Sequence, residues 1–258
     1  MLQSGLVSIT FRQLSIEQIV ARVASTGLAG IEWGGDVHVP HGDHNAARRA
    51  RRCCEDAGIA CCAYGSYYRA GEPADETNPD FQSVLETAHT LEVSSIRVWA
   101  GRRGSGSADE SYRARVEADL QRIGTLAAAA RIVVTCEFHA GSLTDTNDSA
   151  LRFYQTVNHP NVHALWQPPF AMPVAECTAG LKNLLPWLWN LHVFEWTEIE
   201  GQRQRDPLEN GTEHWQEWIR IAAGTGRLHW ALLEFLAGDD PDLLAAEART
   251  LNALIACT

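Results

Sequence analysis

Four residues that can hold a metal ion stand at or near the ends of four successive apolar segments. Glu137 ends segment 132–137, Gln167 follows 162–166, His192 lies late in 188–194, and Glu234 ends 228–234. Two carboxylates, an amide oxygen and an imidazole form an oxygen-rich donor set with one nitrogen. Such a set suits Mg²⁺ or Mn²⁺, with Zn²⁺ and Co²⁺ as alternatives. Taken singly, His192 and Gln167 are explained about as well by structural hydrogen bonds, so the prediction depends on the fold.

The elements that would position these residues alternate along the whole chain. Apolar segments of strand length are followed, eight times, by amphipathic segments of helical length. The expected strands are 5–10, 29–33, 59–64, 94–99, 132–137, 162–166, 188–194 and 228–234. The expected helices lie near 15–26, 43–57, 78–91, 108–129, 147–157, 173–184, 212–223 and 240–254. This alternation predicts a parallel sheet covered by helices.

A closed barrel explains the pattern better than an open sheet. The turn after the first strand contains no glycine-rich phosphate loop, which an open nucleotide-binding sheet would carry there. We therefore predict the α/β fold class and a single (β/α)8 TIM barrel that spans residues 1–258 as one domain. The chemistry of such barrels lies at the carboxyl ends of the strands. In that fold the four residues can meet at one point.

Local signals mark several helix ends. Ser15 is expected as an N-cap with Gln18 at the capping-box position. Gly27 and Gly58 stand where a helix must end before the next strand. The Asp240–Pro241 pair predicts the start of the last helix. Residues 101–109, after the fourth strand, most resemble a flexible insert.

Two further groups of residues are weighed against a metal or ligand role. The loop histidines His38, His41 and His44 are more simply polar loop residues than a metal cluster. Trp33, Trp99, Trp166 and Trp196 fall at strand ends, where they serve equally well as core residues or as stacking surfaces for a sugar ring.

Composition excludes several classes of protein. The formal net charge of −11 disfavours nucleic acid as a partner. No apolar run is long enough for a membrane span, and the N-terminus lacks the features of a signal peptide, so a cytoplasmic location is expected. The seven cysteines form neither a disulfide framework nor a zinc motif. Assembly into a homo-oligomer is left open.

Five motifs, in order, resemble the xylose isomerase-like TIM-barrel superfamily of sugar phosphate isomerases and epimerases. They are GIEWGGD, IRVWAG, CEFHAG, LHVFEW and LLEF. The resemblance covers essentially the whole chain and implies one divalent metal ion, held by Glu137, Gln167, His192 and Glu234. One departure is clear: most relatives carry Asp-x-x-His on strand six, whereas this chain has Gln167 and Phe170.

The resemblance implies a metal-dependent sugar or sugar-phosphate isomerase or epimerase. Its enediolate intermediate would form by proton transfer to and from Glu137 and Glu234, with the metal stabilising the charge. Six residues are expected to contact the carbohydrate substrate: Glu32, Tyr64, Trp99, His139, Glu195 and Arg203. A dehydratase or lyase acting on a cyclic polyol is the first alternative, because the same chemistry can expel water. A metal-free barrel that binds a small molecule or a protein is the second, whereas cleavage of DNA at abasic sites is disfavoured.

Overall fold

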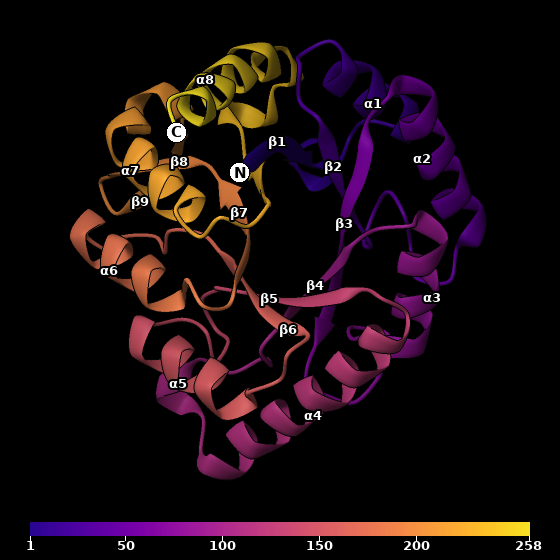
Figure 1. Ribbon diagram of the computed structural model, residues 1–258, viewed down its shortest axis with the longest axis vertical. Helices are drawn as coiled ribbons and strands as arrows, with labels where there is room; N and C mark the ends of the chain where they lie inside the picture. The colour runs from indigo at the N-terminus through magenta and orange to yellow at the C-terminus, as the bar shows by residue number, and fades with distance from the viewer.

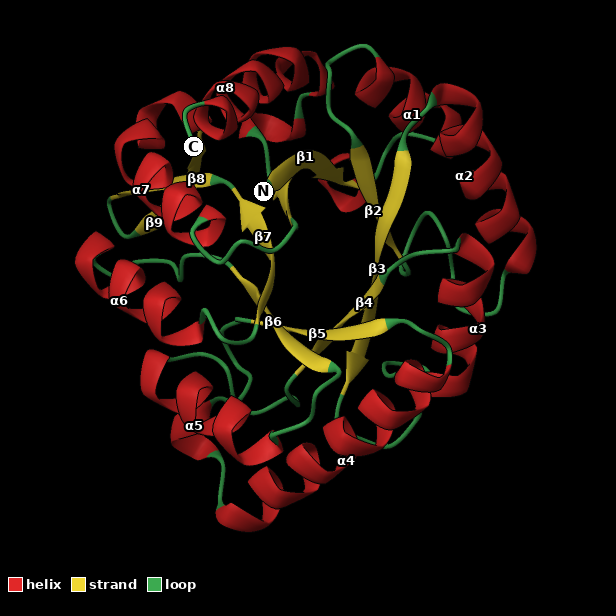
Figure 2. Cartoon of the chain, viewed as in Figure 1, coloured by secondary structure: helices red, strands yellow, loops and turns green.

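Eight parallel strands close into a barrel with a ring of helices around it. The computed structural model describes all 258 residues. The strands follow the order β1-β10-β7-β6-β5-β4-β3-β2 around the barrel. Figure 1 looks along the barrel, and in Figure 2 the strands form the inner ring and the helices the outer one. The prediction of a (β/α)8 barrel is confirmed.

Every expected strand and helix is present, with shifts of a few residues at most of the ends. The barrel strands are β1 Leu2–Val7, β2 Gly30–Gly34, β3 Ala60–Arg69, β4 Ser95–Trp99, β5 Val133–Glu137, β6 Val162–Trp166, β7 Leu188–Val193 and β10 His229–Leu233. The helices are α1 Ile16–Ala24, α2 His44–Ala57, α3 Phe81–Leu91, α4 Glu110–Ala129, α5 Asn147–Val157, α6 Val174–Leu184, α7 Thr212–Ala223 and α8 Leu244–Ala256. No helix combines the length and the apolar character that crossing a membrane requires.

The expected helix ends at Ser15 and Gly58 are confirmed, whereas α1 ends at Ala24 with Ser25 as its cap, before Gly27, and the last helix starts later than expected. Ser15 caps α1 in a capping box with Gln18, and Gly58 ends α2 with a φ of 68°. Asp240 instead accepts a hydrogen bond from the backbone of Asp242, and Pro241 begins a short 3-10 turn. Helix α8 therefore starts at Leu244, because one tight turn separates the proline from the regular helix.

One antiparallel hairpin, absent from the predicted elements, follows β7. Its strands are β8 Glu195–Ile199 and β9 Gln202–Asp206. Glu200 and Gly201 form the turn with φ angles of 51° and 75°. Two successive positive φ angles are typical of the tight hairpin turn that matches strand twist. The hairpin adds a short two-stranded wall beside the barrel.

Alternation along the strands separates an apolar layer from a charged one. On β2, Ile31 and Trp33 belong to the large hydrophobic core, and Glu32 between them does not. Strand β4 repeats the pattern with Arg97 between Ile96 and Val98. Successive side chains of a strand point to opposite faces, so the charged residues face the inside of the barrel.

Candidate active site

Six polar side chains meet inside the barrel near the carboxyl ends of its strands. All of them are buried: Glu32, Arg97, Glu137, Gln167, His192 and Glu234. They come from β2, β4, β5 and β7 and from the residues that directly follow β6 and β10. A charge that is buried in this way must be paired or must bind a ligand. We call these six residues the floor of the site.

Arg97 joins two carboxylates of the floor. Its Nε donates to Glu32 Oε1 at 2.8 Å, and its Nη1 donates to Glu137 Oε2 at 2.6 Å. Burial opposes the ionisation of Glu137, but the charges of Arg97 and His192 outweigh it and lower the pKa of Glu137 to about 2. The indole of Trp99 also donates to Glu137 Oε2. Both glutamates bound by Arg97 are therefore held as carboxylates.

His192 lies between the other pair of carboxylates. Its Nε2 is 3.3 Å from Glu32 Oε2, and its Nδ1 is 3.1 Å from Glu234 Oε2. Burial lowers the basicity of the imidazole, but Glu234 and Glu32 outweigh it and raise the pKa of His192 to about 10. With His192 protonated, three carboxylates face two cations, so the floor keeps one net negative charge.

Unused lone pairs on the floor match the donor set of a metal ion. Gln167 Nε2 donates to Glu137 Oε1 at 2.9 Å and to the backbone oxygen of Phe138 at 3.0 Å. This fixes the amide and leaves Gln167 Oε1 buried without a partner. His192 Nδ1 and Glu234 Oε2 also lack a hydrogen bond, because their close contact is poorly aligned. Glu137 Oε1 accepts a single hydrogen bond and retains one lone pair.

The floor is not a finished metal site. No three His, Cys, Asp or Glu side chains converge in a metal-binding arrangement. The charge and type of the donors nevertheless fit a divalent cation, because a neutral His192 would leave the floor with two net negative charges. The residues present therefore suit such an ion once His192 has lost its proton.

A cavity of about 530 Å³ opens above the floor. Four of the six floor residues line it, namely Arg97, Glu137, Gln167 and Glu234. Its upper walls are largely aromatic and come from the strand ends and the hairpin: Tyr67, Trp99, Phe138, Phe170, Phe194, Trp196 and Phe235. The size and the mixture of aromatic and charged groups suit one small ring-shaped ligand.

Three of the six residues expected to contact substrate line this cavity. They are Trp99, His139 and Arg203. The rings of Trp99 and His139 are stacked with their centres 4.7 Å apart, and His139 Nδ1 is 2.6 Å from the backbone oxygen of Ala140. Glu32 was expected to contact substrate, but it lies beneath the cavity as part of the floor. There it contacts Arg97 and His192.

The other two expected substrate residues point elsewhere. Tyr64 neighbours Ile96 in the sheet and belongs to the outward apolar layer, where its hydroxyl donates to the backbone oxygen of Val39 at 2.8 Å. Glu195 turns outward at the start of the hairpin and lies 2.8 Å from His214 Nε2. Neither residue lines the cavity. Tyr64 points outward because successive side chains of a strand face opposite sides. Glu195 points away from the cavity because it begins the hairpin.

The loop histidines, the cysteines and the strand-end tryptophans each have a defined place in the structure. Each loop histidine has its own partner, Ser8 for His38, Tyr64 for His41 and Thr90 for His44, so they form no cluster. All seven cysteines are free. Of the four tryptophans weighed as stacking surfaces, Trp33 and Trp166 are core residues, and Trp99 and Trp196 line the cavity.

Two important site residues were not predicted. Arg97 carries a sequence signal, an arginine inside the apolar segment IRVW, since a charge there must have a buried partner. Tyr67 carries none. Its φ of 57° and the irregular pairing of β3 with β4 turn it toward the cavity, where the Arg97 guanidinium lies 5.0 Å from its ring.

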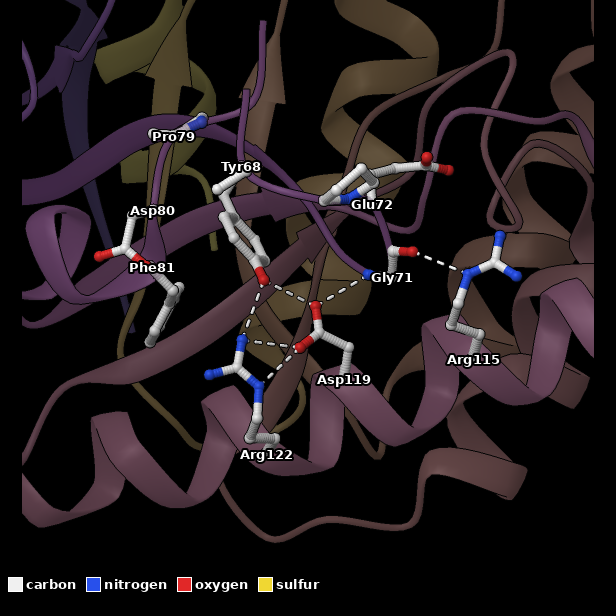
Figure 3. Close-up of a pocket in the computed structure, with 11 residues that line it drawn as sticks. Tyr68, Gly71, Glu72, Pro79, Asp80, Phe81, Arg115, Asp119 and Arg122 are labelled. Atoms are coloured by element: carbon white, nitrogen blue, oxygen red, sulfur yellow. Dashed lines mark hydrogen bonds and ion pairs between the residues drawn. The ribbon is translucent and has the colours of Figure 1, made fainter. Parts of the chain in front are cut away.

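A second hollow, of about 550 Å³, lies outside the barrel beside α4 (Figure 3). Asp119 accepts hydrogen bonds there from Tyr68 at 2.7 Å and from the backbone of Gly71 at 2.8 Å. Arg122 binds the same carboxylate at 2.8 Å, and Arg115 donates to the backbone oxygen of Gly71 at 2.9 Å. These contacts fasten the loop after β3 to α4, which is a structural role.

One curated sequence and two solved structures are similar to this chain over nearly their full length. A 3-dehydroshikimate dehydratase from Bacillus anthracis is 26% identical over 275 residues, which covers 96% of each protein. The crystal structure of the probable 3-DHS dehydratase from Bacillus anthracis matches with a TM-score of 0.79 at 23% identity, covering 98% of this chain and 99% of that one. The structure of 3-keto-D-glucoside 4-epimerase from E. coli matches with a TM-score of 0.72 at 15% identity, covering 100% of both chains.

These relatives are enzymes that share the barrel described above. A model of the xylose isomerase-like TIM barrel family matches residues 20–254. The match covers most of the chain, including seven of the eight barrel strands. The chain therefore belongs to the xylose isomerase-like TIM barrel family.

Proposed function

We propose that the protein is a dehydratase that removes water from a small, ring-shaped hydroxy ketone. The observation that carries this proposal is a carboxylate oxygen and a guanidinium N–H group without hydrogen bonds at one cavity: Glu234 and Arg97 both line the cavity, and Glu234 Oε2 and Arg97 Nη2 are buried without a hydrogen bond. One can remove a proton beside a carbonyl group, and the other can stabilise the enolate oxygen that results. The 26% identity to a dehydratase along nearly the whole chain supports the same reaction class.

Glu234 is the better base of the two glutamates. Glu137 is held as a carboxylate by Arg97 and Trp99, and its pKa of about 2 makes it a weak proton acceptor near neutral pH. Glu234 Oε2 accepts no hydrogen bond, and the nearest charged group is His192, whose Nδ1 lies 3.1 Å away. In this proposal Glu137 positions Arg97 and Gln167, and Glu234 carries the proton.

Arg97 Nη2 supplies the donor for the enolate oxygen. A Cβ atom at position 65 would lie 2.5 Å from Nη2, so Gly65 leaves the space that this part of the guanidinium occupies. A fixed buried donor stabilises developing negative charge without the reorganisation that water requires.

His139 is the proposed acid for the leaving hydroxyl. It lines the cavity and is stacked on Trp99. Loss of water is then balanced: Glu234 takes the proton from the carbon beside the carbonyl group, the enolate collapses to the carbonyl while a new carbon–carbon double bond forms, and the C–O bond breaks so that the hydroxyl leaves as water with a proton from His139. The aromatic walls suit a flat, unsaturated product ring.

A divalent metal ion, with Mn²⁺ or Mg²⁺ the first choices, would be held by Gln167, His192, Glu234 and Glu137. When bound, such an ion would supply Lewis-acid stabilisation of the enolate charge. The three unpartnered atoms of Gln167, His192 and Glu234 support this assignment. The proton on His192 must leave before the ion can bind.

Epimerisation of a keto sugar is the second candidate, because it begins with the same proton removal and a relative of the same fold catalyses it. Purified protein with added Mn²⁺ would be incubated with 3-dehydroshikimate in one arm and with ketoses in D₂O in the other. Formation of an aromatic acid, followed by ultraviolet absorption and mass spectrometry, supports the dehydratase. Deuterium uptake by a ketose without loss of water would replace it with the epimerase.

A further inference from the structure

We infer that the substrate carries a carboxylate group, which Arg203 binds at the mouth of the cavity while Phe170 and Trp196 hold the guanidinium in place. The inference rests on the proposed function, since it names the class of substrate that the same cavity accepts. It concerns the part of the ligand that does not react.

Arg203 is the one arginine of the cavity without an acidic partner. Three arginines line the cavity. Arg12 pairs with Asp36, and Arg97 pairs with two glutamates of the floor. The side chain of Arg203 makes no hydrogen bond or ion pair, and its guanidinium lies over two aromatic rings. Its five N–H donors are therefore free for a ligand.

Two aromatic rings fix the guanidinium of Arg203. Its central carbon lies 4.7 Å from the ring centre of Phe170 and 4.5 Å from that of Trp196. Trp196 is itself packed against Phe194 and Phe235, with ring centres 5.1 Å and 5.5 Å away. Stacking uses the faces of the guanidinium and leaves the N–H groups at its edge exposed. A cation held in this way loses little side-chain entropy when it binds a ligand.

A carboxylate fits this cation better than a phosphate does. The planar fork of one arginine matches one carboxylate with two parallel hydrogen bonds. Glu137, Glu234 and Asp145 also line the cavity and repel a doubly charged group. A single free cation balances a single negative charge. The adjacent aromatic wall suits a ring, so the expected ligand is a cyclic carboxylic acid.

Calorimetric titration of the full chain with benzoate and benzamide tests the assignment without turnover. The two probes match in shape and differ in charge. We expect the wild type to bind benzoate more tightly than benzamide. Arg203→Gln should lower the affinity for benzoate about ten- to a hundredfold and leave the affinity for benzamide unchanged. Arg205→Gln is the matched control, because Arg205 lies on the same strand but pairs with Asp239. It should keep the affinity for benzoate.

The role of Phe170 is tested with two variants, one that removes the aromatic ring and one that keeps it. Phe170→Leu removes one ring from Arg203 and should weaken benzoate about two- to fivefold, whereas Phe170→Tyr should keep wild-type affinity. Circular dichroism verifies that each variant is folded. A loss that is equal for benzoate and benzamide would indicate general damage to the pocket and overturn the positioning role.

Three results would overturn the carboxylate assignment. The first is equal benzoate affinity in wild type and Arg203→Gln, and the second is a loss of benzoate affinity in Arg205→Gln as large as that in Arg203→Gln. The third is tighter binding of inorganic phosphate than of benzoate. The outcome is separable from that of the proposed reaction. If 3-dehydroshikimate is not dehydrated but benzoate binding depends on Arg203, the acid site stands and the reaction is wrong. If it is dehydrated with an unchanged KM in Arg203→Gln, the reaction stands and the acid site is wrong.

Discussion

Replacing Arg97 by glutamine should cost much of the protein's stability near neutral pH. The guanidinium is buried and bonded at 2.8 Å to Glu32 and at 2.6 Å to Glu137, so its removal leaves two buried carboxylates short of positive charge. Removing one partner of a buried ion pair costs about 3–5 kcal/mol. For a chain of this size that corresponds to a fall in Tm of roughly 6–20 °C.

The pH dependence of this loss carries the sharper test. The lowered pKa of Glu137 means that its pairing stabilises the fold above about 4.5, and that this contribution disappears as the pH falls to about 2. Urea denaturation of wild type and Arg97→Gln should therefore give a free-energy difference that is largest at pH 7 and shrinks below 4.5.

Arg152→Gln is the control for this measurement, since Arg152 pairs with Glu110 at the exposed surface. Its loss should leave the free energy of unfolding nearly unchanged at any pH, because water screens an exposed ion pair. A difference below about 1 kcal/mol for Arg97→Gln, or one that is the same at pH 3 and pH 7, would refute the assignment of a stabilising buried ion pair.

Four further predictions concern the same floor. Glu234→Gln should lower kcat about 10²- to 10⁴-fold in the dehydration assay, and it should also lower Tm because buried His192 loses one of its two carboxylate partners; full activity would remove Glu234 as the base. Gly65→Ala should destabilise the fold by about 1–3 kcal/mol in urea, because the new Cβ would lie 2.5 Å from Arg97 Nη2. In chelator-treated protein, stability from His192 should be complete below pH 6.5 and lost as the pH rises to about 10, and Tm measured against pH should flatten in His192→Gln. Gln167→Asp should raise the affinity for Mn²⁺ roughly tenfold by calorimetry, and weaker binding would contradict a ligand role for position 167.

The barrel could be predicted because its strands carry a periodic signal, whereas the hairpin carries none. Segment 195–206 reads EWTEIEGQRQRD, with a glutamate on each face of β8 and only glutamine, arginine and aspartate in β9. Such residues are poor strand formers when exposed. The hairpin is held instead by tertiary contacts, since Trp196 packs on Phe235 and Arg205 pairs with Asp239. These contacts join segments about 40 residues apart, so no local sequence pattern predicts them.

The candidate site could be predicted as far as strand ends define it. Glu137, Gln167, His192 and Glu234 do meet on the floor, and this follows from their positions after β5, β6, β7 and β10. Whether a strand-end residue faces inward depends on alternation, which its position at the strand end does not reveal. A one-residue step along a strand moves a side chain to the other face. Tyr64 therefore faces the helices, while Gly65 and Arg97, paired in the sheet, face the inside.

Charge balance explains why an amide is accommodated at position 167. A carboxylate there would be a fourth anion beside Glu32, Glu137 and Glu234, against two cations at most. It would also face Glu137, where Gln167 now donates a hydrogen bond of 2.9 Å. The amide thus stabilises the ionised Glu137 and still offers its oxygen to the cavity. With glutamine the floor can stay folded around a protonated His192, whereas an acid at this position would require the metal ion for stability.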